Sequence, residues 1–338
     1  MNTENDILVL KDLEIGFRKG RKTIASLLSG VNVSAGRGEL VALIGQNGIG
    51  KSTLLKTIVS LHEQLSGEIL FSNKDILDYS ATELSSLVGF VSTEVIRVGN
   101  LTVRDLISLG RFPYTNWLGK LIQEDHELVN RAMEMVNLLN FADKNVSEIS
   151  DGERQRAMIA RTIAQDTDIL VLDEPTAFLD LPNRYEVIQL LRHLSEEKGK
   201  LVIFSTHDLE MVINEADKIW MMTKEEMVNG APEDLVLNGS FNHLFPGSKA
   251  VFNKESGSFS YLREGKKEII LSGAGTAFEW TKKALQRKGY IPVRNGSSIK
   301  IHVNTNIAND IIEWLVSTKN EEFRVNSILE LIRVCQGL

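Results

Sequence analysis

The feature that most constrains the fold is a glycine-rich segment that follows an apolar run and precedes a helix-like stretch. Its residues are Gly45, Gln46, Asn47, Gly48, Ile49, Gly50, Lys51, Ser52 and Thr53. They fit the pattern G-x-x-x-x-G-K-[ST], in which backbone N–H groups at a helix start converge on phosphates, the lysine reaches the terminal phosphates and the next hydroxyl can bind Mg²⁺. An incidental lysine after a glycine-rich turn is the alternative, which the flanking strand and helix patterns disfavour.

Three short apolar runs predict strands of a parallel sheet. They span residues 40–44, 169–172 and 201–204 and are nearly continuous in Val, Ile and Leu, which is typical of strands buried on both faces. Each run leads into polar residues: the glycine-rich segment, the sequence DEPT, and the sequence STHD. Because ligands of open α/β sheets bind at the carboxyl edge of the strands, we expect the site there.

Asp173 and Glu174 close the second of these runs. Neighbouring residues of a strand point in opposite directions, so Asp173 could bind a metal ion while Glu174 orients an attacking water. An isolated Asp-Glu pair would by default be two solvated acids. The phosphate-binding pattern upstream favours the functional interpretation.

The remaining sequence predicts three further regions. Residues 75–150 carry helix-like patterns and little strand signal, which indicates a helical subdomain at about 94–150. The first domain is expected to span 1–235, and a Gly, Asn, Ser and Pro-rich connector to span 236–266. A small α+β domain is expected at 267–338.

Within this C-terminal domain, the patterns predict a β-α-β-β-α-β order plus a last helix, compatible with a ferredoxin-like fold. The predicted strands are 268–272, 290–294, 298–303 and 322–326, and the predicted helices are 277–288, 307–317 and 327–335. A short G-x-G at residues 273–275 is a weak dinucleotide signal. Thr276 and Glu279 instead favour a capped helix start.

Composition excludes several classes of function. The chain has 338 residues, 38 Lys and Arg against 45 Asp and Glu, and a formal net charge of −7, which argues against nucleic acid as a partner. The single cysteine, Cys335, cannot form an internal disulfide, and the chain start resembles no secretion signal, so we expect a cytoplasmic location. No apolar stretch reaches the roughly 18 residues of a membrane span, so any membrane role needs a partner.

Residues 149–156, ISDGERQR, closely resemble the LSGGQ signature of ATP-binding-cassette (ABC) ATPases. Ser150 and Glu153 also fit a capping box, and a capped helix start offers free N–H groups and the positive end of the helix dipole. The resemblance implies that this helix start meets the γ-phosphate of ATP held by a second subunit. The residues implied to bind ATP in trans are Ser150, Asp151, Gly152 and Glu153, with Asp180 of the D-loop.

Two further positions match the family. Phe17 stands where ABC proteins place an aromatic ring that stacks on adenine, although a phenylalanine is often an ordinary core residue. His207, in STHD, stands at the place of the switch histidine that senses the γ-phosphate and positions the water. A structural histidine is the alternative there.

Two positions depart from the family. Thr93, with Glu94 beside it, occupies the place of the Q-loop glutamine, which puts metal coordination by that loop in doubt. Asp151 replaces the first glycine of the signature. Because a carboxylate near a triphosphate is repulsive, by very roughly 1 to 4 kcal/mol at about 4 Å, we expect the Asp151 side chain to turn outward.

The resemblance implies an ATPase that uses ATP and Mg²⁺ and works as an ATP-sandwich homodimer on the inner face of the cell membrane. Residues 100–114, ending in LGRFPY, resemble the ATPases of importers for iron-siderophores, haem and vitamin B12. In that family this region docks a separate permease, served by an external substrate-binding protein, and Phe112, Tyr114 and Trp117 suit such an interface or packing within the subdomain.

Two alternatives to transport stay open. One is a soluble ABC ATPase that acts on macromolecules, and the other is a binding module that uses ATP only as a clamp. The C-terminal domain is expected to regulate the protein or stabilise its dimer. Deleting residues 240–338 should then leave nucleotide binding intact.

Overall fold

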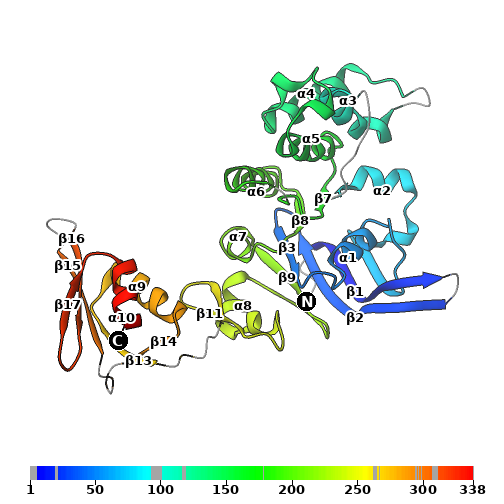
Figure 1. Cartoon of the computed structure of the whole chain (residues 1–338). Helices are drawn as coiled ribbons and strands as arrows, with labels where there is room; N and C mark the ends of the chain where they lie inside the picture. Colours follow the sequence, from blue (N-terminus) through cyan, green and yellow to red (C-terminus); the bar gives the residue numbers. More distant parts are fainter. Residues whose placement is uncertain are drawn as a thin grey trace. The chain divides into compact units, whose positions relative to one another are not determined.

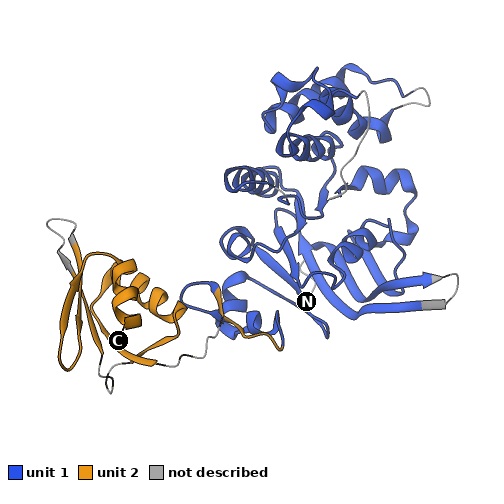
Figure 2. Ribbon diagram, viewed as in Figure 1, with its two compact units in different colours: residues 1–246, 252–258 blue, residues 247–251, 259–338 orange. Residues whose placement is uncertain are grey.

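The computed structural model describes residues 6–19, 22–92, 101–115, 119–177, 179–261, 265, 267–293, 295, 297, 299–306 and 311–337. The chain divides into two compact units (Figure 2). Unit 1 comprises residues 1–246 and 252–258, and unit 2 comprises residues 247–251 and 259–338. Each unit is described by itself below.

Unit 1 is built on a six-stranded sheet with the order β10-β9-β3-β8-β7-β6 (Figure 1). Its strands are β3 (Leu40–Gly45), β6 (Val88–Val91), β7 (Ile169–Leu172), β8 (Leu201–Ser205), β9 (Lys218–Met222) and β10 (Met227–Gly230). Neighbouring strands run parallel, except that β10 pairs antiparallel with β9. The three strands predicted from apolar runs are confirmed as β3, β7 and β8, and they form the centre of the sheet.

A second, antiparallel sheet has the order β2-β1-β4-β5 and was not predicted. It comprises β1 (Asp6–Lys19), β2 (Lys22–Gly36), β4 (Ser66–Phe71) and β5 (Lys74–Asp75). Residues 7–10 of β1 are all buried, and the pairing with β2 shifts register between Leu10 and Leu13, where Asp12 takes a φ of 44°. Such a bulge interrupts the two-residue period by which a strand is found in sequence.

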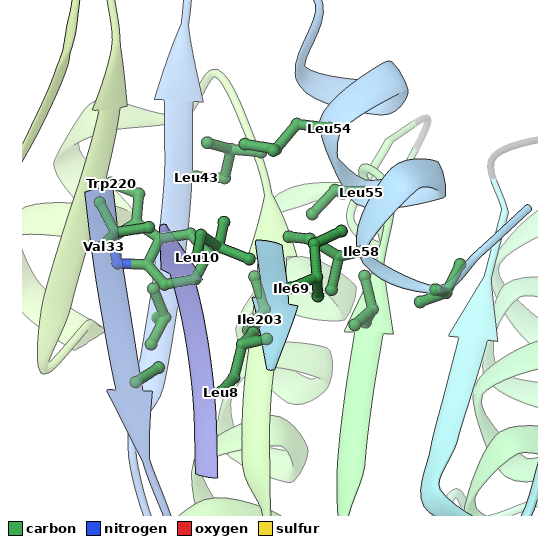
Figure 3. Packing of buried hydrophobic residues seen from close by; sticks show 14 of the residues in the cluster. Leu8, Leu10, Val33, Leu43, Leu54, Leu55, Ile58, Ile69, Ile203 and Trp220 are labelled. Atoms are coloured by element: carbon green, nitrogen blue, oxygen red, sulfur yellow. The ribbon is translucent and has the colours of Figure 1, made fainter. Parts of the chain in front are cut away.

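The two sheets share one hydrophobic core with α1 (Lys51–Ile58) (Figure 3). Side chains from β1, β2 and β4 meet those of the parallel sheet and of α1; among them are Leu8, Leu10, Val33, Leu43, Leu54, Leu55, Ile58, Ile69, Ile203 and Trp220. Burial of these apolar side chains fixes α1 and the end of β3 relative to each other. The glycine-rich segment therefore begins and ends on rigid elements.

Helices cover the rest of unit 1. α6 (Leu181–Glu196) and α7 (Leu209–Glu215) pack on the parallel strands, while α2 (Ala81–Leu87) packs against β6 (Figure 1). α3 (Val103–Ser108), α4 (Gln123–Met135) and α5 (Asp151–Ala164) pack together with the 3₁₀ helix η2 (Leu109–Tyr114) as the helical subdomain. The remaining helices of unit 1 are α8 (Pro232–Asn238) and the short η1 (Ile76–Asp78), η3 (Leu139–Phe141), η4 (Val146–Glu148) and η5 (Ser240–His243).

The segment after α8 is part of unit 1 rather than a free connector. Phe241 and Leu244 are buried, and the Phe241 ring stacks on Phe252 with centroids 4.7 Å apart. The Gln46 side chain of the glycine-rich segment donates a hydrogen bond of 2.8 Å to the Leu244 carbonyl. A cut at residue 240, as the sequence suggested for removing the C-terminal domain, would therefore take core residues out of unit 1.

β11 (Ala250–Asn253) and β12 (Ser258–Tyr261) pair as a separate two-stranded sheet, whose residues are divided between the two units. Unit 2 contains a five-stranded sheet with the order β14-β13-β15-β16-β17. Its elements are β13 (Lys267–Ser272), α9 (Gly275–Arg287), β14 (Tyr290–Val293), β15 (Lys300–Asn306), β16 (Ile311–Ser317), β17 (Glu322–Val325) and α10 (Ile328–Gly337). β13 pairs parallel with both β14 and β15, and β15, β16 and β17 are antiparallel.

Two predictions for the C-terminal domain were wrong. Within the helix predicted at 307–317, residues 311–317 form β16 and residues 307–310 lie outside the described part of the chain, so the described order is β-α-β-β-β-β-α and not that of a ferredoxin-like fold. The reason is visible in β16, where Trp314 and Val316 are buried at a period of two and lie opposite Val303 and Ile301 of β15. In addition, α9 begins at Gly275 after Ala274 and has no side-chain cap, so Thr276 lies inside its first turn.

Candidate functional site

The glycine-rich segment forms a loop between the end of β3 and the start of α1, as its sequence predicts. Gly48 and Gly50 take φ values of 75° and 117°, which side chains larger than glycine rarely adopt. A Cβ at Gly45 would lie 2.7 Å from the Met222 carbonyl oxygen of the neighbouring strand. The loop can hold this shape only because glycine occupies these positions, and it delivers the chain to the positive end of α1.

Lys51 occupies the interior of the loop. Its side chain is only 6% exposed, and its Nζ donates hydrogen bonds to the carbonyl oxygens of Gly45 at 2.9 Å and Gln46 at 3.3 Å. Burial lowers the pKa of Lys51, and the nearby carboxylates of Glu174 and Asp173 oppose that shift. The loop lysine and the acidic pair at the end of β7 thus interact through their charges in one site.

Asp173 and Glu174 follow β7 and have different surroundings. Asp173 is buried, and its backbone N–H donates to the Val91 carbonyl at 2.8 Å. Glu174 is partly exposed and takes a φ of 48°, an uncommon conformation for a residue other than glycine. The backbone N–H of Glu174 donates to Ser205 Oγ at 2.8 Å, and Ser205 Oγ donates to Asp173 Oδ1 at 2.7 Å.

His207 lies beside Glu174. Its Nδ1 is 3.6 Å from Glu174 Oε1, and its side chain is 64% exposed. The exposed ring does not contribute to the core, which disfavours a purely structural role for this histidine. Lys51, Asp173, Glu174 and His207 therefore gather at the carboxyl edge of β3, β7 and β8, as predicted for a ligand site of a parallel sheet.

Phe17 is the aromatic residue that the sequence assigned to adenine. Its side chain is 44% exposed, so the alternative of an ordinary core phenylalanine is not supported. The ring makes an edge contact with His62, with centroids 5.4 Å apart, and His62 Nε2 lies 2.7 Å from the Gly16 carbonyl. The exposed part of the ring is available for stacking.

The signature segment starts α5 with a complete capping box. The Ser150 N–H and hydroxyl both donate to Glu153 Oε2, at 2.7 and 2.8 Å, and the Glu153 N–H donates to Ser150 Oγ at 3.2 Å. These hydrogen bonds from Ser150 lower the pKa of Glu153. Asp151 is exposed and accepts a bond of 2.6 Å from Arg154 Nη1, while Gly152 follows it in the first turn.

Asp180, which the family resemblance assigned to the D-loop, is the N-cap of α6 and accepts bonds from the backbone N–H of Asn183 at 3.2 Å and from Asn183 Nδ2 at 2.5 Å. Asn183 Oδ1 in turn accepts a bond of 2.8 Å from Arg156 Nη1 on α5. Asn183 and Arg156 thereby connect the D-loop to the signature helix. The sequence patterns did not single out Asn183.

Several predicted positions are not tested by this geometry. Thr93 and Glu94, proposed at the Q-loop site, and Trp117 lie outside the described residues. Phe112 and Tyr114 of the LGRFPY segment are 69% and 42% exposed, and the Tyr114 ring also packs against the Arg111 guanidinium at 4.0 Å. Their predicted use as a docking surface stays a prediction.

The residues present suit a magnesium–nucleotide complex. Among the described residues, no group of three or more His, Cys, Asp or Glu could hold a metal ion unaided. Mg²⁺ bound with a nucleotide needs only one or two protein oxygens, because phosphates and waters supply the other ligands. The exposed Ser52 hydroxyl on the first turn of α1 and the Asp173 carboxylate are oxygen donors of that kind.

Comparison with known proteins agrees with this site. Residues 28–177 match the ABC transporter family model, and residues 266–335 match the model of the iron ABC transporter C-terminal domain. An ABC transporter ATP-binding protein of Methanocaldococcus jannaschii is 35% identical over 274 residues, covering 80% of this chain and 93% of the relative. The petrobactin import ATP-binding protein FpuC of Bacillus anthracis is 35% identical over 242 residues, covering 71% and 89%.

Solved structures of ABC transporters are also similar to this chain. A metal-chelate type ABC transporter in an inward-facing conformation matches with a TM-score of 0.62 and 27% identity, over 76% of this chain and 96% of that one. A dimeric ABC transporter cassette bound to ADP and Pi matches with a TM-score of 0.59 and 28% identity, over 67% and 98%. The chain therefore belongs to the ATP-binding proteins of the ABC transporter family, and it is an ATPase whose hydrolysis is coupled to transport.

Proposed function

We propose that this protein is the ATP-hydrolysing subunit of an import system for an iron-siderophore, haem or a corrinoid. Relatives with about a third of their residues identical include the FpuC protein above and the ferric enterobactin transport ATP-binding protein FepC of Escherichia coli. The match of residues 266–335 to an iron ABC transporter C-terminal domain supports the same class of cargo.

The catalytic part of this proposal rests on one observation, which is that Glu174 and His207 are paired beside Lys51. Glu174 Oε1 and His207 Nδ1, 3.6 Å apart, are placed to orient a water and to contact the terminal phosphate that Lys51 binds. Mg²⁺, bound through Ser52 and Asp173, would neutralise charge that develops on the phosphates. In this arrangement Phe17 stacks on the adenine.

The proposed working state is a homodimer. α1 and its loop pack with β1 and β3, whereas the signature helix α5 packs with α3 and α4. One chain thus carries the two halves of an ATP sandwich on different parts of unit 1, and the capped start of α5, with Asp180 nearby on α6, would complete the site of a second copy. Closure depends on ATP because only the nucleotide contacts both surfaces.

The dimer would work on a separate membrane permease that receives cargo from an external substrate-binding protein. Among the described residues, no helix is long and apolar enough to cross a bilayer. The exposed Phe112 and Tyr114 supply an apolar surface for a permease segment. This arrangement places the protein peripherally on the inner face of the membrane.

The test compares the wild-type protein with Glu174→Gln. We expect the wild-type protein to release phosphate from Mg-ATP, the variant to release it at least about a hundredfold more slowly, and the variant to form a stable dimer only with Mg-ATP. Sedimentation measures the dimer, and Lys51→Ala serves as the control that should not dimerise. Equal phosphate release by both proteins, or a Glu174→Gln protein that stays monomeric in saturating Mg-ATP, would contradict the proposal.

Coupling to import needs a cellular measurement. Cells that lack the gene should lose uptake of a ferric siderophore, haem or corrinoid, and the wild-type gene but not the Glu174→Gln gene should restore it. Co-purification of the protein with a polytopic permease supports the transport function. An active ATPase that restores none of these uptakes would favour the alternative of a soluble ABC ATPase.

A further inference from the structure

Ser205 is fully buried and forms hydrogen bonds with both acidic residues of the site. It closes β8, and Asp173 follows the end of β7. β7 and β8 are adjacent and parallel, with Leu172 opposite Phe204, so the next residue of each strand comes side by side. The serine therefore reaches the site through strand register, although it lies 32 positions from Asp173 in sequence.

The Ser205 hydroxyl uses both of its hydrogen-bonding capacities on the acidic pair. Its single proton is donated to Asp173 Oδ1 at 2.7 Å, and its oxygen accepts the backbone N–H of Glu174 at 2.8 Å. One oxygen of the Asp173 carboxylate is thus fixed by the protein. The orientation of the other oxygen is set at the same time.

The backbone of Glu174 needs such support. Its φ of 48° lies in the left-handed region, where a non-glycine residue persists only when its surroundings hold it. The bond from the Glu174 N–H to Ser205 Oγ directly anchors the residue that carries this strain. Without that acceptor, a backbone donor in a partly buried environment would lose its partner.

We propose that Ser205 is a positioning residue for ATP hydrolysis, which holds the Glu174 backbone and the Asp173 carboxylate in one fixed relation. The direction of the Glu174 side chain toward water and the direction of the Asp173 oxygen toward the metal are then set by the same hydroxyl. The inference rests on the proposed roles of Asp173 and Glu174. It assigns Ser205 no contact with the nucleotide.

The test uses four variants of the full chain. Ser205→Ala removes the hydroxyl, while Ser205→Thr and Ser205→Val have nearly the same shape and differ in the hydroxyl. Ser195→Ala is the matched control, because Ser195 is equally buried and its hydroxyl donates to the Arg192 carbonyl at 2.9 Å on α6. Each protein is measured for thermal unfolding, for kcat and KM of ATP hydrolysis, and for binding of a fluorescent ATP analogue with and without Mg²⁺.

We expect Ser205→Ala to lower kcat by about tenfold to a hundredfold, the range seen when residues that orient metal ligands are removed. KM for ATP and binding of the analogue without Mg²⁺ should change by less than about threefold, since the phosphate loop is intact, while the tightening of binding by Mg²⁺ should weaken. Ser205→Thr should be faster than Ser205→Val. Ser195→Ala should keep the wild-type kcat.

Three outcomes separate a failure of this inference from a failure of the proposed function. If the wild-type protein hydrolyses ATP faster than Glu174→Gln but Ser205→Ala has the kcat and Mg²⁺ response of Ser195→Ala, the inference alone is overturned. The same holds if Ser205→Ala lowers the unfolding temperature without changing kcat of the folded protein. If the wild-type protein is no faster than Glu174→Gln, the proposed function fails and Ser205 has no reaction to support.

Discussion

Asp151 is the residue at which the chain departs from the family signature, in which a glycine occupies this position. Its carboxylate is 77% exposed and is bound by the Arg154 guanidinium at 2.6 Å. The ion pair therefore partly neutralises the charge that would repel a triphosphate, and the outward turn of the side chain away from ATP stays a prediction. The capping box of Ser150 and Glu153 is complete despite the substitution.

We predict that Asp151→Gly leaves the ATPase rate within a few fold of wild type, because the Arg154 guanidinium already partly neutralises the carboxylate. Steady-state phosphate release measures this. Ser150→Ala is the contrasting variant and should lower both the rate and the stability of α5, the latter by about 1 kcal/mol for loss of an N-cap. A hundredfold rise in the rate of Asp151→Gly would show instead that Asp151 inhibits the site.

At the scale of elements, a buried ion pair connects two parts of the helical subdomain. Arg111 Nε donates to Asp125 Oδ1 at 2.8 Å, both side chains are less than a tenth exposed, and the Ile122 N–H donates to Asp125 at the start of α4. Burial acts to raise the pKa of Asp125, but the Ile122 N–H and the Arg111 guanidinium outweigh it and lower that pKa. The pair joins η2, which carries the exposed Phe112, to α4.

We predict that Asp125→Ala destabilises the protein by about 3 to 5 kcal/mol, because it leaves the buried Arg111 charge without its carboxylate partner. Asp168→Ala is the control, since the Arg37–Asp168 pair is nearly half exposed and should cost at most about 1 kcal/mol. Urea unfolding at neutral pH measures both changes. Equal losses for the two variants would contradict the role assigned to the buried pair.

The same pair predicts a pH dependence with a definite sign. Because folding lowers the pKa of Asp125, its stabilising contribution is complete above the ordinary aspartate pKa of 3.8 and is lost as the pH falls through the lower folded value. The stability difference between wild type and Asp125→Ala should therefore shrink in acid. A difference that grew on acidification would show that the carboxyl is neutral in the folded protein.

At the scale of the whole molecule, the boundary of unit 1 lies beyond the one that the sequence suggested. Phe241 and Leu244 are in its core, Phe252 stacks on Phe241, and Gln46 binds the Leu244 carbonyl. The segment that precedes unit 2 is therefore attached to the phosphate loop. The position at which the chain is truncated therefore determines whether this attachment is kept.

We predict that a chain ending at residue 258 binds ATP as the full chain does, because it keeps every segment of unit 1. A chain ending at residue 239 should unfold at a lower temperature and bind ATP more weakly, because it loses two buried aromatic rings and the partner of Gln46. Calorimetric ATP titration and thermal unfolding compare the two chains. If both bind alike, the segment after α8 does not support the loop.

The sequence by itself determined the parts of the site that depend on local spacing. The loop from Gly45 to Lys51 requires glycine at fixed positions, the capped start of α5 requires Ser150 three residues before Glu153, and the strands β3, β7 and β8 are continuous apolar runs. Each signal lies within a few residues of chain, so no knowledge of distant contacts is needed to recognise it.

Only the tertiary structure decided which distant residues meet. Ser205 reaches Asp173 through the register of β7 and β8, Asn183 connects Asp180 with Arg156, and Leu244 meets Gln46. The strand β16 was likewise fixed by its pairing with β15, which outweighed the local helix-like pattern. These contacts join residues that are far apart in sequence. A local sequence pattern does not specify such pairs, because the packing of sheets and helices decides which side chains come into contact.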